Sequence, residues 1–192
     1  MTLLLAGILL FVGGHSINLV APKFRLNMIE RLGLNPWKGI YSVVAGIGLA
    51  CLIFGYGEAR AEGYWLWNPP LWTKHLATLL IFVAVLFLTA SHVPGNRLQV
   101  AVGHPMYLGI KIWAFAHLLA NGTVQDLLLF GSLLIWGVFG FTVSRRRDRQ
   151  AGITREYQGL SRDVITLVIS VLVWAGITFW LHQLLIGVAP VA

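Results

Sequence analysis

Charged residues are scarce in this sequence. Only 11% of its 192 residues are charged and 57% are hydrophobic, with a mean hydropathy of +0.77, whereas soluble domains average about 25% charged and about 45–50% apolar residues. A soluble domain of this length still exposes about a third of the surface of its unfolded chain, and so much apolar surface could not be kept from water. The composition therefore excludes soluble, disordered and collagen-like proteins and indicates an integral membrane protein.

Cysteine is also scarce. The sequence has one, Cys51, which excludes a disulfide framework and a zinc site of the CxxC type. The histidines form neither an HxxxH nor an HExxH motif. A compact zinc site needs three or four ligands, and the spacing of these histidines does not supply them.

Long runs without charge predict membrane helices. Residues 1–22, 39–57, 75–96, 127–144 and 164–192 contain no charged side chain, and residues 105–121 contain only Lys111. About 20 apolar residues span a bilayer as a helix, and runs such as 79–90 lack the alternation of a barrel strand. We therefore predict six helices, at about 2–20, 38–57, 74–92, 106–121, 124–143 and 163–186. The expected fold is all-α, a polytopic transmembrane helix bundle formed by residues 1–192 as a single integral membrane domain. The first four helices are expected to form the working core and the last two to brace it.

The distribution of basic residues predicts the orientation. Segments 21–37, 93–105 and 144–162, with Lys38, hold eleven of the Lys and Arg residues, and the other side holds only Arg60 and Lys74. Basic loops remain on the cytoplasmic side, so both termini are expected in the periplasm of a bacterial inner membrane. Attraction to anionic lipid explains the net charge of +7 without a nucleic-acid partner.

Two connecting segments carry local signals. Asn121 and Gly122 are typical of a helix end, and Thr123 with Asp126 has the spacing of a helix start, which predicts a tight hairpin. The aromatic segment YWLWNPPLW (64–72) is expected to lie at the membrane interface, with a substrate lid as the alternative.

Histidines are the main candidates for function, because ionisable residues are expensive within a membrane. Three of the six lie in predicted spans, at positions 15, 117 and 182. His15 follows Gly13 and Gly14, and Asn18 lies on the same helical face. Two interpretations stay open here. Either the glycines allow close helix packing, or they let a flat macrocycle approach while His15 binds its metal.

His117 shares a helical face with Trp113 and Asn121. It is either a hydrogen-bonded packing residue or a metal ligand. Each histidine stands alone on its helix, and this arrangement suits a haem held between helices better than a zinc site. Lys111 points elsewhere; it extends toward the basic end, pairs with a propionate or phosphate, or takes part in a proton path.

Four motifs give a family resemblance: GGHS (13–16), PWKGIYS (36–42), VPGNR (93–97) and GHPMYLGIKIWAFAHLLANG (103–122). Over most of residues 1–150 the chain resembles the NnrU family of bacterial membrane proteins, which is linked to denitrification and distantly similar to zeta-carotene isomerase, an enzyme with a b-type haem. The resemblance implies haem b with His15 and His117 as axial ligands. It also implies an apolar polyene substrate, to be isomerised, or a respiratory membrane complex as partner. Residues expected to support the haem are His104, Asn18, Asn121 and Lys111.

The depth of the two histidines bears on this ligand pair. At the rise of an α-helix, His15 lies about 7–8 Å from the basic end and His117 about 15–18 Å. Two ligands of one iron lie at similar depth. The alternative pairs are His15 with His92 or His104, and His117 with His75.

Two further functions remain open. GHPMYLG (103–109) is similar to the HPxYxG motif of membrane methyltransferases that use S-adenosylmethionine, although only Glu156 stands where those enzymes have paired glutamates. A non-enzymatic assembly or sensing subunit is the other alternative. The sequence assigns no catalytic residue.

Overall fold

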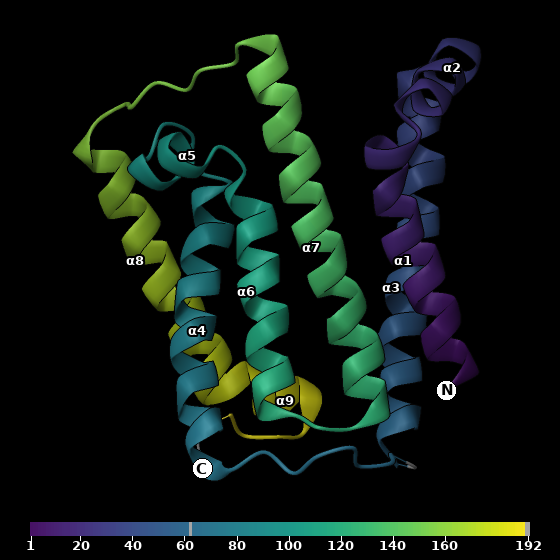
Figure 1. The fold of residues 1–192 in the computed structure, drawn as a ribbon, viewed down its shortest axis with the longest axis vertical. Helices are drawn as coiled ribbons and strands as arrows, with labels where there is room; N and C mark the ends of the chain where they lie inside the picture. The colour runs from purple at the N-terminus through teal and green to yellow at the C-terminus, as the bar shows by residue number, and fades with distance from the viewer. Residues whose placement is uncertain (62, 191–192) are drawn as a thin grey trace.

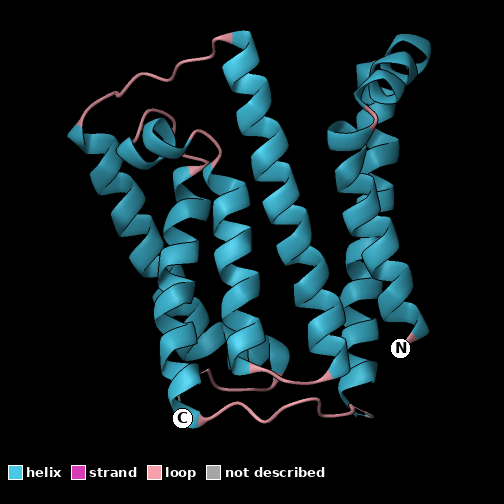
Figure 2. Cartoon of the chain, viewed as in Figure 1, coloured by secondary structure: helices cyan, strands magenta, loops and turns pink. Residues whose placement is uncertain are grey.

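The computed structural model describes residues 1–61 and 63–190. Figure 2 shows a molecule built of helices joined by loops. Within these residues, five helices are long and apolar enough to cross a membrane, and α6 is a shorter apolar one. The elements are α1 (Thr2–Val20), α2 (Pro22–Leu32), α3 (Leu34–Ala61), α4 (Leu71–Ala90), α5 (Arg97–Val102), α6 (Pro105–Ala120), α7 (Val124–Ala151), α8 (Leu160–Gly176), the π-helical turn η1 (Ile177–Leu181) and α9 (His182–Ile186). The all-α bundle of about six spans is confirmed.

Several helix boundaries differ from the prediction. The predicted helix 124–143 continues as α7 to Ala151, because arginine is a good helix former and charge alone does not end a helix. It ends where Gly152 takes a left-handed conformation, with φ at 63°. The short helices α2 and α5 were not predicted, since neither is long enough to span a membrane.

The helices form a hairpin and a larger group. α1 packs along α3, α4 along α6 and α8, and α7 lies between α6 and the α1–α3 hairpin (Figure 1). Glycines bring α1 and α3 into close contact. A Cβ added at Gly55 would lie 2.4 Å from the Leu4 nitrogen, one at Gly7 would lie 2.6 Å from the Leu52 nitrogen, and Gly48 makes a similar approach.

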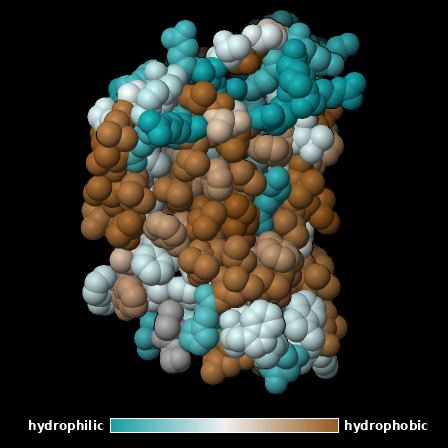
Figure 3. Space-filling view, turned by 60° about the vertical axis from the view of Figure 1, so that its left-hand side comes forward, coloured by the Kyte–Doolittle hydropathy of each residue, from teal (hydrophilic) through white to brown (hydrophobic). Residues whose placement is uncertain are grey.

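The two ends of the bundle differ in chemistry. α2, α5 and the C-terminal end of α7 lie at one end, and the N-terminus lies toward the other (Figure 1). Figure 3 shows hydrophilic residues gathered at that first end, above an apolar belt. The three segments predicted to face the cytoplasm therefore share one end, which we call the basic end. The side of the membrane that it faces stays a prediction.

The α6–α7 hairpin is tight, as predicted. The Thr123 hydroxyl accepts a hydrogen bond from the Asp126 backbone, and the Asp126 carboxylate accepts one from the Thr123 backbone. The Tyr56 hydroxyl donates to the same carboxylate at 2.5 Å and so ties α3 to α7. Backbone hydrogen bonds from Leu66 and Trp67 to the Gly122 carbonyl hold the aromatic segment against this hairpin.

Candidate ligand site around His15 and His117

His15 lies on α1 and faces two neighbouring helices. Its Nδ1 lies 2.7 Å from the carbonyl oxygen of Phe11, one turn earlier. Its ring meets Tyr41 of α3 at a centroid distance of 5.4 Å and Trp136 of α7 at 6.2 Å, both edge to face. Tyr107 of α6 lies 5.0 Å from the Trp136 ring. Four helices therefore contribute to the surroundings of His15.

His117 has a similar local geometry on α6. Its Nδ1 lies 2.8 Å from the Trp113 carbonyl oxygen. Phe130 of α7 stacks on its ring at 4.5 Å, and the Trp113 ring lies at 4.4 Å. The Asn121 side chain donates to the His117 carbonyl oxygen at 2.9 Å. Aromatic rings thus pack closely around this imidazole.

Both histidines have the Nδ1 hydrogen bond that is common in metal-binding histidines. A backbone carbonyl is an acceptor only, so Nδ1 carries a proton, and in a neutral imidazole Nε2 then presents a lone pair. Metal-binding histidines usually donate their other ring nitrogen to such an acceptor. Among residues 1–61 and 63–190, neither Nε2 has a hydrogen-bond partner. His92 makes the same bond to the Leu88 carbonyl on an exposed surface, so this pattern needs support from the surroundings.

The surroundings favour His15. The positions where Gly13 and Gly14 would carry a Cβ have no atom within 4 Å, so α1 is uncovered at the two residues that precede His15. The glycines that pack α1 against α3 are Gly7, Gly48 and Gly55, which lie elsewhere on these two helices. Trp136 is 8% exposed, and its indole N–H has no partner within the described chain. Each imidazole has an aromatic ring one turn earlier, Phe11 at 4.3 Å from His15 and Trp113 at 4.4 Å from His117. The difference is that a free donor lies beside His15, whereas Phe130 stacks on His117.

The two imidazoles contact α7 at different levels. His15 contacts Trp136 and His117 contacts Phe130, six residues or about 9 Å apart along the helix. This agrees with the difference in depth estimated from the sequence. A bond from a metal to imidazole is about 2 Å long, as for zinc, so two ligands of one iron hold their Nε2 atoms about 4 Å apart. The donor chemistry fits haem iron at each histidine, but the levels do not fit one iron held by both.

The four supporting residues lie in different places. Asn121 contacts His117 as described, and the exposed Asn18 accepts a hydrogen bond from Arg147 at its backbone carbonyl. The Lys111 ammonium lies 4.2 Å from the centre of the Phe141 ring, having extended toward the basic end. His104 lies at the basic end, where its Nε2 is 2.9 Å from the Asp148 carboxylate.

Residues 124–143 were expected to brace the bundle, and they also contact the candidate residues. α7 supplies Trp136 to His15 and Phe130 to His117. Tyr41, Tyr107 and Trp136 were also missed. Tryptophan and tyrosine are common in membrane helices, and only the spacing of Tyr107 within the 103–122 motif gave a signal.

A second cluster lies at the mouth of α6. Asp148 contacts Arg155 at 2.7 Å as well as His104. Burial by itself would raise the pKa of the Asp148 carboxyl, but Arg155 and His104 together lower it. The adjoining pocket of about 330 Å³ includes His92, His104, Tyr107 and Arg155 in its lining. Glu156 is exposed and is not part of this lining, so no observation here favours the methyltransferase.

Comparison with known proteins gives one match. The model of a family described as NnrU protein matches residues 3–190, nearly the whole chain. No curated protein and no solved structure matches the chain. Within the described residues, no group of three or more His, Cys, Asp or Glu side chains is placed to hold a metal ion.

Proposed function

Because this chain belongs to the NnrU family, we propose that it is a haem-binding membrane protein of nitrogen-oxide respiration. We assign His15 as the residue that would bind the iron of a haem b beside α1, α3 and α7. The observation that carries this assignment is the unpaired indole N–H of buried Trp136, whose ring contacts His15. The hydrogen bond from His15 Nδ1 to the Phe11 carbonyl leaves Nε2 available to bind iron.

The residues around His15 have distinct roles in this proposal. Gly13 and Gly14 leave room for a planar ring to approach α1. Tyr41 and Trp136 fix the plane of the imidazole through edge-to-face contacts. The indole N–H of Trp136 is a buried donor without an acceptor, which is costly unless a ligand supplies one. When bound, haem supplies an iron that can change its oxidation state.

His117 has a different role. Its ring is stacked on Phe130 and contacts α7 about 9 Å from the level of His15. We assign it to packing between α6 and α7, with its Nδ1 bonded to the Trp113 carbonyl. If His117 were to bind the same iron as His15, α1 would have to slide along α7 by more than one helical turn.

An absorption spectrum tests the proposal. The protein is expressed with ample haem, purified in detergent and measured in oxidised and reduced form. The wild type is expected to show a Soret band, and His15→Ala to lose at least about nine-tenths of it, since second-shell changes alone cost 10–100-fold in metal affinity. His117→Ala is expected to keep the band.

The matched control is His92→Ala. This variant removes a histidine with the same carbonyl hydrogen bond from an exposed position, and its spectrum is expected to match the wild type. A colourless wild-type protein overturns haem binding itself. A band that survives in His15→Ala but disappears in His117→Ala overturns the choice of ligand.

The proposed role in nitrogen-oxide respiration has its own test. Deleting the gene in a denitrifying host is expected to slow nitrite or nitric oxide reduction, and the His15→Ala allele is expected not to restore it. If the deletion strain reduces nitrite and nitric oxide normally, the proposed respiratory role is wrong, whereas the proposal of haem binding is unaffected.

A further inference from the structure

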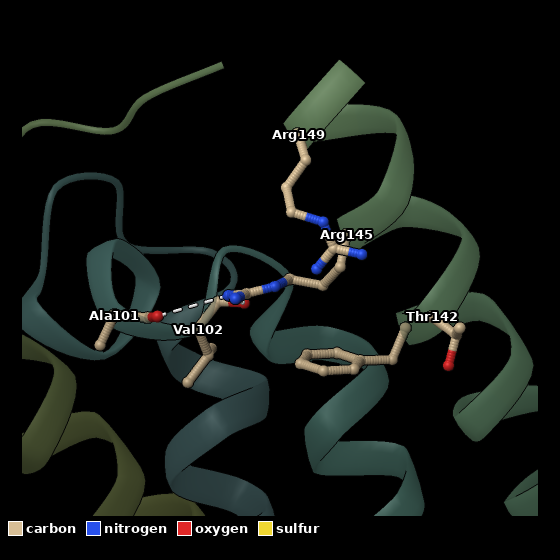
Figure 4. A pocket seen from close by; sticks show the side chains of 6 residues that line it. Ala101, Val102, Thr142, Arg145 and Arg149 are labelled. Carbon is tan, nitrogen blue, oxygen red and sulfur yellow. Dashed lines mark hydrogen bonds between the residues drawn. The ribbon is translucent and has the colours of Figure 1, made fainter. Parts of the chain in front are cut away.

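A pocket at the basic end lies away from both intramembrane histidines. Its volume is about 350 Å³, and it lies between α5 and the last turns of α7. Its lining consists of Ala101, Val102, Phe141, Thr142, Arg145 and Arg149. Figure 4 shows the two arginine side chains reaching over this pocket from α7. Basic and apolar groups therefore meet in one recess.

The cations around this pocket have few protein partners. Arg145 Nη1 donates to the Val102 carbonyl oxygen at 2.9 Å and to the Ala101 carbonyl oxygen at 3.5 Å, which leaves its other nitrogens for a ligand. The Arg149 side chain has no hydrogen bond or ion pair within the described residues. No carboxylate belongs to the lining. The nearest acid along α7, Asp148, is already engaged by His104 and Arg155.

Lys111 adds a third positive charge. Its ammonium lies 4.2 Å from the centre of the Phe141 ring, and the Arg145 guanidinium lies 5.9 Å from the same centre. The two charges are thus within about 10 Å of each other, so salt does not fully screen their repulsion. An anion bound in the pocket would relieve this repulsion.

We propose that this pocket binds the phosphate of an anionic phospholipid, such as phosphatidylglycerol. The phosphate contacts Arg145 and Arg149, and the acyl chains leave over Phe141 and Val102 into the apolar belt. The apolar lining residues Phe141 and Val102 favour a lipid over a free anion, because inorganic phosphate gains nothing from apolar contacts. Basic pockets on the cytoplasmic side of helix bundles bind such headgroups in other membrane proteins.

Lipid titration with native mass spectrometry tests the site. The purified protein in detergent is titrated with dioleoyl phosphatidylglycerol, dioleoyl phosphatidylcholine or inorganic phosphate. Arg149→Gln is expected to weaken phosphatidylglycerol binding about five-fold, corresponding to about 1 kcal/mol per cation near an anionic headgroup. Arg145→Gln/Arg149→Gln is expected to weaken it further. The Arg149 side chain has no hydrogen bond or ion pair within the described residues, so Arg149→Gln tests the site even if the double variant disturbs α5.

The control is the double variant Arg31→Gln/Arg146→Gln. It removes the same charge from two exposed positions, and it is expected to change binding by less than about two-fold because neither residue lines the pocket. An equal loss in this control would reduce the effect to general surface attraction and overturn the site. Equal binding of phosphatidylcholine would also overturn it. So would inorganic phosphate binding as tightly as the lipid.

Discussion

Arg147 of α7 donates a hydrogen bond of 3.0 Å to the carbonyl oxygen of Leu19 on α1. A second bond of 2.9 Å joins the same guanidinium to the Asn18 carbonyl. The last carbonyl groups of a helix have no partner within the helix, and a cation at this end also interacts favourably with the helix dipole. Arg147 therefore fastens α1 to α7 one turn beyond His15.

Replacing Arg147 by Gln is expected to destabilise the protein by about 1 kcal/mol, since two charge-assisted hydrogen bonds are lost at a partly exposed site. Thermal unfolding in detergent, followed by circular dichroism, measures this loss. Arg146→Gln has the same charge change without these bonds and is expected to unfold like the wild type. Equal unfolding temperatures for the two variants would show that this link contributes nothing.

The close packing of α1 on α3 gives a second prediction. A Cβ at Gly55 would lie 2.4 Å from a backbone nitrogen of α1, which cannot move aside as a flexible side chain does. Gly55→Ala is therefore expected to separate the helices and destabilise the protein by about 1–3 kcal/mol. Gly57→Ala is the control, because nothing lies within 4 Å of its Cβ position. This second variant is expected to be neutral or stabilising, since alanine is the better helix former. Unfolding both variants in parallel decides whether the close contact exists.

The sequence predicted the spans well and the contacts poorly, for physical reasons. A membrane helix must be long and apolar whatever it packs against, so α1 begins and ends as expected. The different levels of His15 and His117 also follow from helical rise alone. The partners of these residues depend on which helix faces meet. The contact of Trp136 with His15, 121 positions apart in the chain, carries no local signal.

The basic end shows the same limit. His104 appeared as a candidate for the haem site because of its motif, and the structure places it against Asp148 of α7. Segment 144–162 appeared as one loop because it is rich in arginine. Its first part continues α7, and the side chain of Arg155 returns to contact Asp148. Such pairing depends on tertiary structure and cannot be derived from composition.

Asp148 gives a prediction of pH dependence. It lies in the arginine-rich extension of α7, outside the apolar span, and its pKa is lowered by Arg155 and His104 against the opposing effect of burial. A carboxyl with a lowered pKa in the folded state stabilises the protein fully above its unfolded pKa of about 3.9, and this contribution is lost as pH falls through the lower folded value. Asp148→Asn is therefore expected to unfold at a lower temperature than the wild type at pH 7.

The difference between Asp148→Asn and the wild type is expected to persist down to about pH 4 and to shrink below it. Unfolding temperatures measured from pH 7 to pH 3 follow this change. Glu156→Gln, at an exposed position in the same loop, is the control and is expected to show little difference at any pH. If the unfolding temperatures of Asp148→Asn and the wild type differ by the same amount from pH 7 to pH 3, the charge of Asp148 is not what stabilises the fold.

The number of protein ligands on the iron gives the last prediction. If His15 is the only residue of the chain that binds the iron, as proposed, carbon monoxide is expected to bind the reduced protein on mixing. Two histidine ligands would make binding slow, because one of them must first leave. Stopped-flow absorption of the reduced wild type with carbon monoxide separates these cases. His117→Ala is expected to bind at the wild-type rate, since Phe130 holds that imidazole about 9 Å along α7 from the level of His15. Slow binding by the wild type that becomes fast in His117→Ala would place both histidines on the iron and would require α1 to slide along α7.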